Sequence, residues 1–461
     1  MADLDLALTG GELVFPDRGT ARADLGIAGG RIAMIAAPGE LPRAAETIDC
    51  TGRFVFPGII DPHNHVGFGA GDDDFLSEPR SAAVGGVTTF INFYRTNDFT
   101  ADFEDYRART EAPTCVDYAF HFGLTSRRHI ETLRETAERF GVCSFKLYLM
   151  YKGEYGRSKG FAEVDDGLLF AAMQAVAGIP GGVLGVHCEN TEVIPWLRGP
   201  LTAAGRDDLA AWDEQSPDFL EAENIHRVAY FGARTGCPVN IVHISSAEGL
   251  SEARRHQAAR KTRVTVETCP HYLHLTRDHP NGTLCKVNPA VRSEADVDAL
   301  WEGIRDGSII TVGCDHVPRK RSTKMGGIWK ATAGFPGLAV SLAVVMHEGY
   351  HKRGIPIDRI AAVMSGNSAR LYHIPSKGDL AVGMDGDVTV VDPELEKVVD
   401  PAGHHSHSDY SPYEGETLKG WPVATILRGV VLMRDGELTD AALSKRPGRF
   451  IERRGPRHAR S

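Results

Sequence analysis

Residues 58–65 read GIIDPHNH, a short apolar run that ends in a His-Asn-His triplet. Seven further apolar runs of similar length follow it. They are TTFINF (88–93), DYAFHF (117–122), CSFKLYL (143–149), GVLGVH (182–187), VNIVHI (239–244), RVTVET (263–268) and IITVGC (309–314). Eight such runs separated by helix-like stretches are typical of a (β/α)8 barrel.

Three of the intervening stretches have the pattern of amphipathic helices. They are RHIETLRETAERFG (128–141), DFLEAENIHRVAYFGARTG (218–236) and SEADVDALWEGIRDG (293–307), and each ends in the glycine that commonly terminates a helix. A doubly wound open sheet is the alternative arrangement of alternating strands and helices. No GxGxxG turn follows the first run, so we predict an α/β fold with a TIM-like (β/α)8 barrel over residues 58–377.

Both ends of the chain contain short strands broken by glycines. DLALTGGELVF and DLGIAGGRIAMIAA lie near the start, and GDLAVGMDGDVTVVD returns to this pattern from residue 378. The glycine pairs at 10–11 and 29–30 predict hairpin turns. We expect residues 1–57 and 378–440 to form one small β-sandwich domain. The basic, Pro- and Gly-rich residues 441–461 predict a C-terminal arm, or alternatively a partly disordered tail.

The composition is that of an ordinary globular protein and excludes several classes. Of 461 residues, 42% are hydrophobic and 24% charged, which argues against a disordered or fibrous chain. A formal net charge of −10 argues against a general binder of nucleic acid or anionic membranes. No apolar run is long enough to span a bilayer, and the first residues lack the basic region of a secretory signal. The eight cysteines form no CxxC pair, so we expect reduced thiols and a cytoplasmic protein.

Six side chains that can bind metals lie at or near the carboxyl ends of the predicted strands, where barrel enzymes gather their catalytic groups. They are His63, His65, Lys146, His187, His243 and Asp315. Side chains two residues apart on an extended segment point the same way, so both imidazoles of the first motif can reach one ion. A single histidine is more often structural. Here, however, five predicted strands of one barrel each place at least one such side chain at or near the carboxyl end. This agreement favours a metal site with nitrogen and oxygen ligands.

Lys146 is the unusual member of this set. Its flanks, CSFKLYLM, are apolar, and an ammonium buried there without a partner would be costly. A protonated lysine cannot bind a cation, but a neutral amine can react with CO2 to give a carbamate whose two oxygens can bridge two metals. The alternative is a lysine whose charged head reaches the rim of the barrel. The residues alone leave both interpretations open.

Six motifs taken together resemble those of the cyclic amidohydrolases of the amidohydrolase superfamily. They are PGIIDPHNH, SFKLYLMYKG, GVHCEN, VHISSAEGL, ETCPHYL and GCDHVP. The similarity is greatest to the dihydropyrimidinase/hydantoinase branch and continues into HHSHSDYSPYEG and RPGRF. It implies an enzyme that opens the amide bond of a dihydropyrimidine or hydantoin, a small-molecule substrate. It also implies two divalent ions per chain, commonly zinc with manganese or cobalt as alternatives, and a homotetramer, with a dimer as the alternative.

The resemblance also implies a role for each matching residue. His63, His65 and Asp315 would hold one ion, His187 and His243 the other, and carboxylated Lys146 would bridge them. A hydroxide between the metals would attack the ring amide carbonyl, with Asp315 as general base and acid. Three further positions would contact the substrate. Tyr151 would stabilise the oxyanion. Asn288 and the backbone near Ala333 would hold the amide or imide edge of the ring.

Several departures from the family pattern affect the substrate. Gly67 stands where a dihydroorotase-like site would place an arginine for a ring carboxylate, which disfavours dihydroorotate. INFYRTND replaces the MPNN-like segment of dihydroorotases and allantoinases, and His271 stands where glutamine is more usual. Arg95 and the run 319–321 place cations after predicted strands. They either bind an anionic substituent at the pocket mouth, or they are solvated surface charges or pair with the acids at 72–74.

Two alternatives to the hydantoinase-like function remain. The first is an allantoinase-like enzyme, or one for another cyclic amide or lactam. The second is a non-catalytic scaffold of dihydropyrimidinase type, whose known examples have lost metal ligands. This chain keeps all six proposed ligands, which argues against the scaffold.

Overall fold

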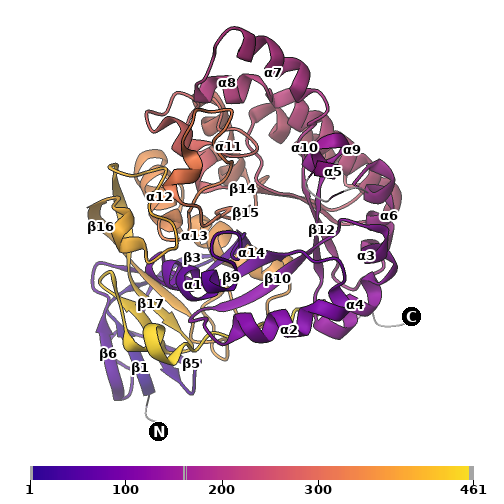
Figure 1. The fold of residues 1–461 in the computed structure, drawn as a ribbon. Helices are drawn as coiled ribbons and strands as arrows, with labels where there is room; N and C mark the ends of the chain where they lie inside the picture. Colours follow the sequence, from indigo (N-terminus) through magenta and orange to yellow (C-terminus); the bar gives the residue numbers. More distant parts are fainter. Residues whose placement is uncertain (1–3, 159–160, 162–163, 456–461) are drawn as a thin grey trace.

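The centre of the molecule is a barrel of eight parallel strands (Figure 1). The computed structural model describes residues 4–158, 161 and 164–455. The barrel strands, in order round the sheet, are β8 (Ile59–Asn64), β9 (Val87–Tyr94), β10 (Asp117–Gly123), β11 (Ser144–Tyr148), β12 (Val183–His187), β13 (Val239–Ile241), β14 (Val264–Thr268) and β15 (Thr311–Val312). The predicted α/β barrel is therefore confirmed, with a strand at each of the eight apolar runs.

The barrel closes through the segment that follows β15. The backbone N–H of His65 donates to the carbonyl of His316 at 2.8 Å, and Asn64 and His316 form a parallel bridge. The backbone N–H of Cys314 donates to the carboxylate of Asp61 at 3.2 Å. Closure thus brings the ends of the first and last strands together, which is where the first and last site motifs lie.

Helices cover the outside of the barrel (Figure 1). They are α1 (Asp74–Val84), α2 (Phe99–Glu111), α3 (Arg127–Glu131), α4 (Leu133–Phe140), α5 (Gly153–Ser158), α6 (Asp166–Ala177), α7 (Ile194–Ala203), α8 (Leu209–Glu214), α9 (Asp218–Thr235), α10 (Ala247–Ala259), α11 (Glu294–Asp306), α12 (Ser341–Val345), α13 (Ile357–Ala361) and α14 (Asn367–Leu371). Short 3₁₀ turns occupy Gly71–Asp73, Leu149–Tyr151, Pro270–Leu273, Gly282–Cys285, Arg321–Lys324 and Pro401–His404, and π-helical turns occupy Met346–Lys352, Ala362–Gly366 and Ala441–Lys445.

The glycines predicted to end helices do so in the left-handed conformation. Gly141, Gly236 and Gly307 follow α4, α9 and α11 with φ of 62°, 73° and 85°. Such a conformation costs a residue with a Cβ more than it costs glycine. The stretch 128–141 differs from prediction, because it forms two helices, α3 and α4, that are divided at Thr132.

Two further sheets lie beside the barrel. A four-stranded sheet has the order β5 (Arg31–Ala36), β4 (Asp24–Ala28), β1 (Leu4–Thr9) and β6 (Ala44–Asp49). A seven-stranded sheet has the order β19 (Glu437–Leu438), β18 (Val430–Arg434), β17 (Thr417–Leu427), β16 (Val388–Val398), β7 (Phe54–Pro57), β2 (Glu12–Phe15) and β3 (Gly19–Arg22). In Figure 1 the indigo N-terminal strands and the yellow C-terminal strands lie together on one side of the barrel.

The two sheets bury a common apolar core. Leu25, Ile27 and Ile32 of the smaller sheet pack in one cluster with Val388 and Ile426 of the larger sheet. This is the sandwich expected from the two β-rich ends of the chain. Along each strand, side chains that point into this core alternate with side chains that point to the opposite face of the sheet.

One of the two predicted hairpins is wrong. The glycine pair at 29–30 joins β4 to β5, which pair antiparallel as predicted. The pair at 10–11 instead lies between β1 and β2, which belong to different sheets. The chain uses these glycines to cross the sandwich, because each strand finds its partner elsewhere: β1 pairs with β4 and β6, and β2 pairs with β3 and β7.

The basic C-terminal segment packs on the chain's own barrel as far as the structure describes it. Backbone hydrogen bonds join Tyr118 of β10 to Arg449 and Ile451, and the N–H of Arg453 donates to the carbonyl of Gly141. The guanidinium of Arg453 is buried and donates to the hydroxyl of Ser144 at 2.8 Å. The rest of the predicted arm, residues 456–461, lies outside the described residues.

Two simpler expectations concern the thiols and the membrane. All eight cysteines are free and buried. In the described part of the chain, no helix combines the length and the apolar character needed to cross a bilayer.

Candidate metal and catalytic site

The His-Asn-His motif and Asp315 meet at the carboxyl end of the barrel. His63 is in β8 and His65 follows it, and their Nε2 atoms lie 3.3 Å and 3.0 Å from Oδ1 of Asp315. Burial favours the neutral acid, but the two imidazoles hold the pKa of Asp315 well below its usual range. The three side chains offer ligand atoms within 4.8 Å of one another, as a shared ion requires.

His187 and His243 approach this group from the next part of the barrel. His187 ends β12, and His243 lies two residues after β13. Their ring centroids are 4.5 Å apart, and His63 lies 5.3 Å from His243. Both histidines are buried, and burial lowers the pKa of each. They are therefore held as neutral imidazoles, the form that binds metal ions.

Lys146 lies inside the barrel with its amine unpaired. Its side chain is 1% exposed, and Nζ has no hydrogen-bond partner among the described residues. The amine lies 5.1 Å and 5.4 Å from the ring centroids of Phe93 and Tyr148. Burial lowers the pKa of Lys146 to about 8. A lysine that reaches the rim is therefore excluded, and the deprotonated amine that carboxylation requires is accessible near neutral pH.

Three of these observations fit a pair of divalent cations held at the site. The lysine amine and Nδ1 of His243 are buried without partners in the described part of the chain. The four imidazoles and the carboxylate supply the nitrogen and oxygen ligands that zinc, manganese and cobalt accept. A cation would also favour the ionised form of Asp315, whose pKa is already held low by His63 and His65.

Two of the proposed ligands have a strained backbone. His243 and Asp315 have φ of 43° and 49°, in the left-handed region that residues with a Cβ rarely adopt. Such a conformation costs on the order of 1–3 kcal/mol and persists only where the surroundings impose it, often at functional sites. Neither the strain nor its position is visible in the sequence.

Buried carboxylates orient two of the histidines. Nδ1 of His63 lies 2.6 Å from Oε1 of Glu267 in β14, and Nε2 of His187 lies 3.0 Å from Oε2 of Glu189. A carboxylate on the far ring nitrogen fixes the tautomer of a metal-binding histidine. Sequence analysis missed both acids. Their signal was an acidic residue in or directly after a predicted buried strand, in RVTVET and GVHCEN.

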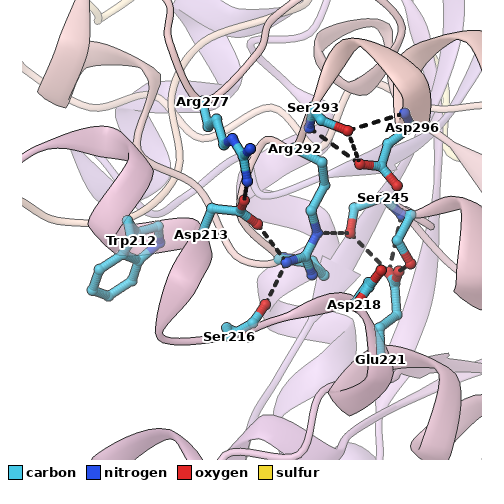
Figure 2. A network of polar contacts seen from close by, with 12 residues as sticks. Trp212, Asp213, Ser216, Asp218, Glu221, Ser245, Arg277, Arg292, Ser293 and Asp296 are labelled. Atoms are coloured by element: carbon cyan, nitrogen blue, oxygen red, sulfur yellow. Dashed lines mark hydrogen bonds and ion pairs between the residues drawn. The ribbon is translucent and has the colours of Figure 1, made fainter. Parts of the chain in front are cut away.

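A polar network around Arg292 lies next to α8 (Figure 2). The hydroxyl of Ser216 donates to Glu189 at 2.6 Å, and the carbonyl of Ser216 accepts from the buried guanidinium of Arg292. Arg292 also donates to Asp213 of α8 at 2.7 Å, as Figure 2 shows. The network therefore holds α8, and with it the neighbouring Trp212, against the body of the barrel.

The six residues open into a cavity of about 610 Å³. Tyr151, Asn288 and Ala333, the predicted substrate contacts, all line this cavity. Tyr151 ends a 3₁₀ turn after β11, and its ring stacks on Phe161 at 4.1 Å. The structure thus brings all nine predicted site residues to one cavity, from segments up to 270 positions apart.

The structure shows the surroundings of the residues that depart from the family pattern, which are Gly67, His271 and the loop cations. Gly67 has φ of 102° and donates its N–H to Asp74 at 3.0 Å, so an arginine would be strained there. His271 is buried beside Phe335 and does not line the cavity. The proposed pairing of loop cations with residues 72–74 is wrong for two of those acids. Asp72 pairs with Arg109, and the carboxylate of Asp74 accepts backbone N–H groups.

Comparison with known proteins identifies the class. The model of the Amidohydrolase family matches residues 221–432. The chain is 33% identical to an allantoinase of Deinococcus radiodurans, covering 95% of this chain and 97% of that protein. It is 32% identical to an L-hydantoinase of Paenarthrobacter aurescens, covering 95% of each. The chain therefore belongs to the amidohydrolase family.

The fold of this chain is also similar to solved structures of hydantoinases and dihydropyrimidinases. An L-hydantoinase (dihydropyrimidinase) from Arthrobacter aurescens superposes with a TM-score of 0.88 at 31% identity, covering 98% of this chain and 100% of that one. A dihydropyrimidinase from Brevibacillus agri superposes with a TM-score of 0.87 at 26% identity, covering 97% and 98%. Its relatives are thus enzymes named hydantoinase, dihydropyrimidinase and allantoinase.

Proposed function

We propose that this enzyme hydrolyses the ring amide bond of a cyclic ureide or imide of the dihydropyrimidine or hydantoin type. The observation that carries the proposal is the group of four histidines, Asp315 and Lys146, all of them buried except the partly exposed His65, which opens into the cavity lined by the predicted substrate contacts. A chain that shares 31–33% identity with hydantoinases and an allantoinase over nearly its whole length supports the same reaction class.

The metal part of the proposal is a pair of divalent ions, zinc in the first place. His63, His65 and Asp315 would hold one ion and His187 and His243 the other, with a carbamate on Lys146 between them. Bound ions would supply hydroxide at neutral pH and polarise the ring carbonyl. The unpaired, buried amine of Lys146 and its lowered pKa support the carbamate.

The remaining steps belong to side chains of this protein. Asp315 takes the proton of the nucleophile and returns it to the leaving ring nitrogen, and its lowered pKa keeps it in the ionised form that can accept a proton. The hydroxyl of Tyr151 donates to the oxyanion as the carbonyl carbon becomes tetrahedral. The side chain of Asn288 and the backbone at Ala333 hold the amide or imide edge of the ring.

Allantoin is the second candidate substrate. The observation that favours it is the identity to the Deinococcus allantoinase, which equals or exceeds that to the hydantoinases. The absence of the MPNN-like segment after β9 favours the hydantoin or dihydropyrimidine instead.

The test is a substrate panel with the metal-loaded enzyme. It contains dihydrouracil, 5-substituted hydantoins, allantoin, dihydroorotate and simple lactams, and ring opening is followed by loss of the ring absorbance and by mass. We expect turnover of hydantoins or dihydrouracil, and little of dihydroorotate. No turnover of any cyclic amide would reject the proposal. Preference for allantoin would select the second candidate, and preference for dihydroorotate would refute the argument from Gly67.

We also propose a cytoplasmic homotetramer. The eight free, buried thiols support a reducing compartment, and the resemblance to the hydantoinase branch supports the tetramer. Its subunit would have the limits given above: residues 1–57 with 378–440 for the sandwich, and 58–377 for the barrel. Light scattering should give a mass near four chains, and a monomer at micromolar concentration would contradict this assembly.

A further inference from the structure

The cavity beside the proposed metal site is lined by an excess of positive charge. Apart from the six site residues, the charged side chains of the described residues that line it are Glu189 and five cations, which are Arg95, Arg198, Lys286, Arg319 and Lys330. Glu189 is already bonded to His187 and Ser216. The proposed metal ions would add positive charge, so they do not neutralise these cations either.

Four of the five cations have no carboxylate partner among the described residues. Arg95, Lys286, Arg319 and Lys330 make no ion pair there. Cations nearby but outside the cavity behave differently. Arg321 pairs with Glu414, and Arg292 pairs with Asp213 (Figure 2). Arg321 and Arg292 therefore have counter-charges, whereas Arg95 and Arg319, inside the cavity, have none among the described residues.

Arg319 has the environment of a binding group. It lies four residues after Asp315 and lines the cavity, and its Nε is buried without a hydrogen-bond partner in the described part of the chain. The titratable groups that act on it are the phenols of Tyr410 and Tyr151, and burial lowers its pKa. A guanidinium in such a place is costly unless an anion completes its hydrogen bonds.

A second cation, Lys286, lies beside the predicted substrate contacts. Lys286 is two residues before Asn288, and Nζ donates to the carbonyls of Ile328 and Ala331 at 2.5 Å each, 3.7 Å from the ring centroid of Trp212. Carbonyl oxygens satisfy its hydrogen bonds but not its charge.

Arg95 stands on the side of His65. Its guanidinium carbon lies 4.5 Å from the ring centroid of Phe68, and that ring is 5.5 Å from the ring of His65. Aromatic faces orient a guanidinium without neutralising it.

The cavity has room for a ring substituent in addition to the ring itself. A cavity of about 610 Å³ is in the range that holds drug-sized ligands and is larger than a ureide ring needs. The dihydroorotase-like position for a ring carboxylate is Gly67, which does not line this cavity. Space and charge are therefore available beyond the ring.

We propose that the substrate is a cyclic ureide whose ring substituent carries a carboxylate, and that Arg319, with Arg95 and Lys286, binds this carboxylate. The inference rests on the proposed function. It adds a specificity subsite to it, made of cations that the ring-opening chemistry does not use.

The test compares three hydantoins that differ only in the end group of the 5-substituent: a carboxylate, its neutral carboxamide and an amine. For the metal-loaded parent enzyme we expect kcat/KM for the carboxylate to exceed that for the carboxamide at least about 10-fold, and the amine to be poorest. This preference should shrink as salt is raised, because ions screen partly exposed charges.

Variants assign the preference to the subsite. In Arg319→Gln and Arg95→Gln, the ratio of carboxylate to carboxamide kcat/KM should fall by roughly 10- to 100-fold, the usual loss for a hydrogen bond to a charged group. The matched control is Lys320→Gln, the neighbouring cation, which does not line the cavity. It should keep the parent ratio. Thermal unfolding of each variant checks that the fold is retained.

The outcomes separate this inference from the reaction class. Turnover of the carboxamide with an equal or lower rate for the carboxylate would overturn the subsite and leave the ring-opening function intact. A parent preference that both variants retain would also overturn it. Failure of the parent on all three hydantoins and on the wider panel would instead reject the proposed function.

Discussion

At the scale of single residues, Lys146 carries the most specific prediction. Lys146→Ala should lose activity and at least one equivalent of metal, because the amine is the source of the proposed bridge and is buried without another role. Metal analysis and rates measure both effects, and added short carboxylates should restore part of the rate by replacing the bridge. Lys320→Ala serves as the control. A Lys146→Ala enzyme with its full metal content and a near-normal rate would contradict the assignment.

Asp315 is the second residue-scale prediction. Asp315→Asn should lower kcat by roughly 10²–10⁴-fold, the usual contribution of general acid–base assistance. KM should change much less, because proton transfer is needed mainly in the transition state. Steady-state kinetics on protein of verified metal content separates this role from metal binding. The assignment fails if a metal-replete variant keeps kcat within a few-fold of the parent.

At the scale of elements, glycines set where helices end. Gly236 follows α9 with φ of 73°, whereas Gly199 lies inside α7, and a Cβ would meet no atom within 4 Å at either position. Gly236→Ala should therefore destabilise the protein by about 1 kcal/mol, because alanine resists the left-handed conformation. Gly199→Ala should change the stability little, because alanine favours the helix but its Cβ would crowd the ring of the next residue, Pro200.

The two substitutions form a matched pair. Both add one methyl group that meets no atom within 4 Å beyond the neighbouring residues, so contacts with the rest of the protein do not differ between them. Thermal and chemical unfolding of the metal-loaded protein would measure the difference. A loss of stability in Gly199→Ala as large as that in Gly236→Ala would show that the left-handed conformation is not what distinguishes these sites.

At the scale of the whole molecule, the C-terminal segment joins the end of the chain to the barrel. A chain that ends at Pro447 lacks the backbone hydrogen bonds to Tyr118 and the buried guanidinium of Arg453. It should unfold at a lower temperature than the full chain, because buried polar groups of the barrel lose their partners.

A chain that ends at Gly455 is the control for this truncation, since it keeps the docked segment. Its unfolding temperature should match that of the full chain. Light scattering of both chains would show whether the docked segment also supports the assembly. Equal unfolding temperatures for all three proteins would mean that the segment contributes nothing to the barrel.

The strands, the barrel and most of the site could be predicted from local sequence. The apolar runs that form β8 to β15 are short, and each is bounded by residues that end strands. His63 and His65 share a direction because the backbone there is extended, and both reach Asp315 as expected. The apolar runs and the direction of the two histidines are properties of adjacent residues, whereas their approach to Asp315, about 250 positions away, was expected from the barrel and the family resemblance.

Other features were decided only by the tertiary structure. The glycine pair at 10–11 crosses between sheets because the partners of β1 and β2 lie elsewhere in the chain.

The tertiary structure also decided which groups surround each side chain. Glu267 reaches His63 across 204 positions, and Arg319 stays without a carboxylate in the described part of the chain while Arg321 finds Glu414. A sequence specifies which side chains can be buried or charged. Which groups share a cavity depends on contacts between distant segments, because burial and charge act through space rather than along the chain.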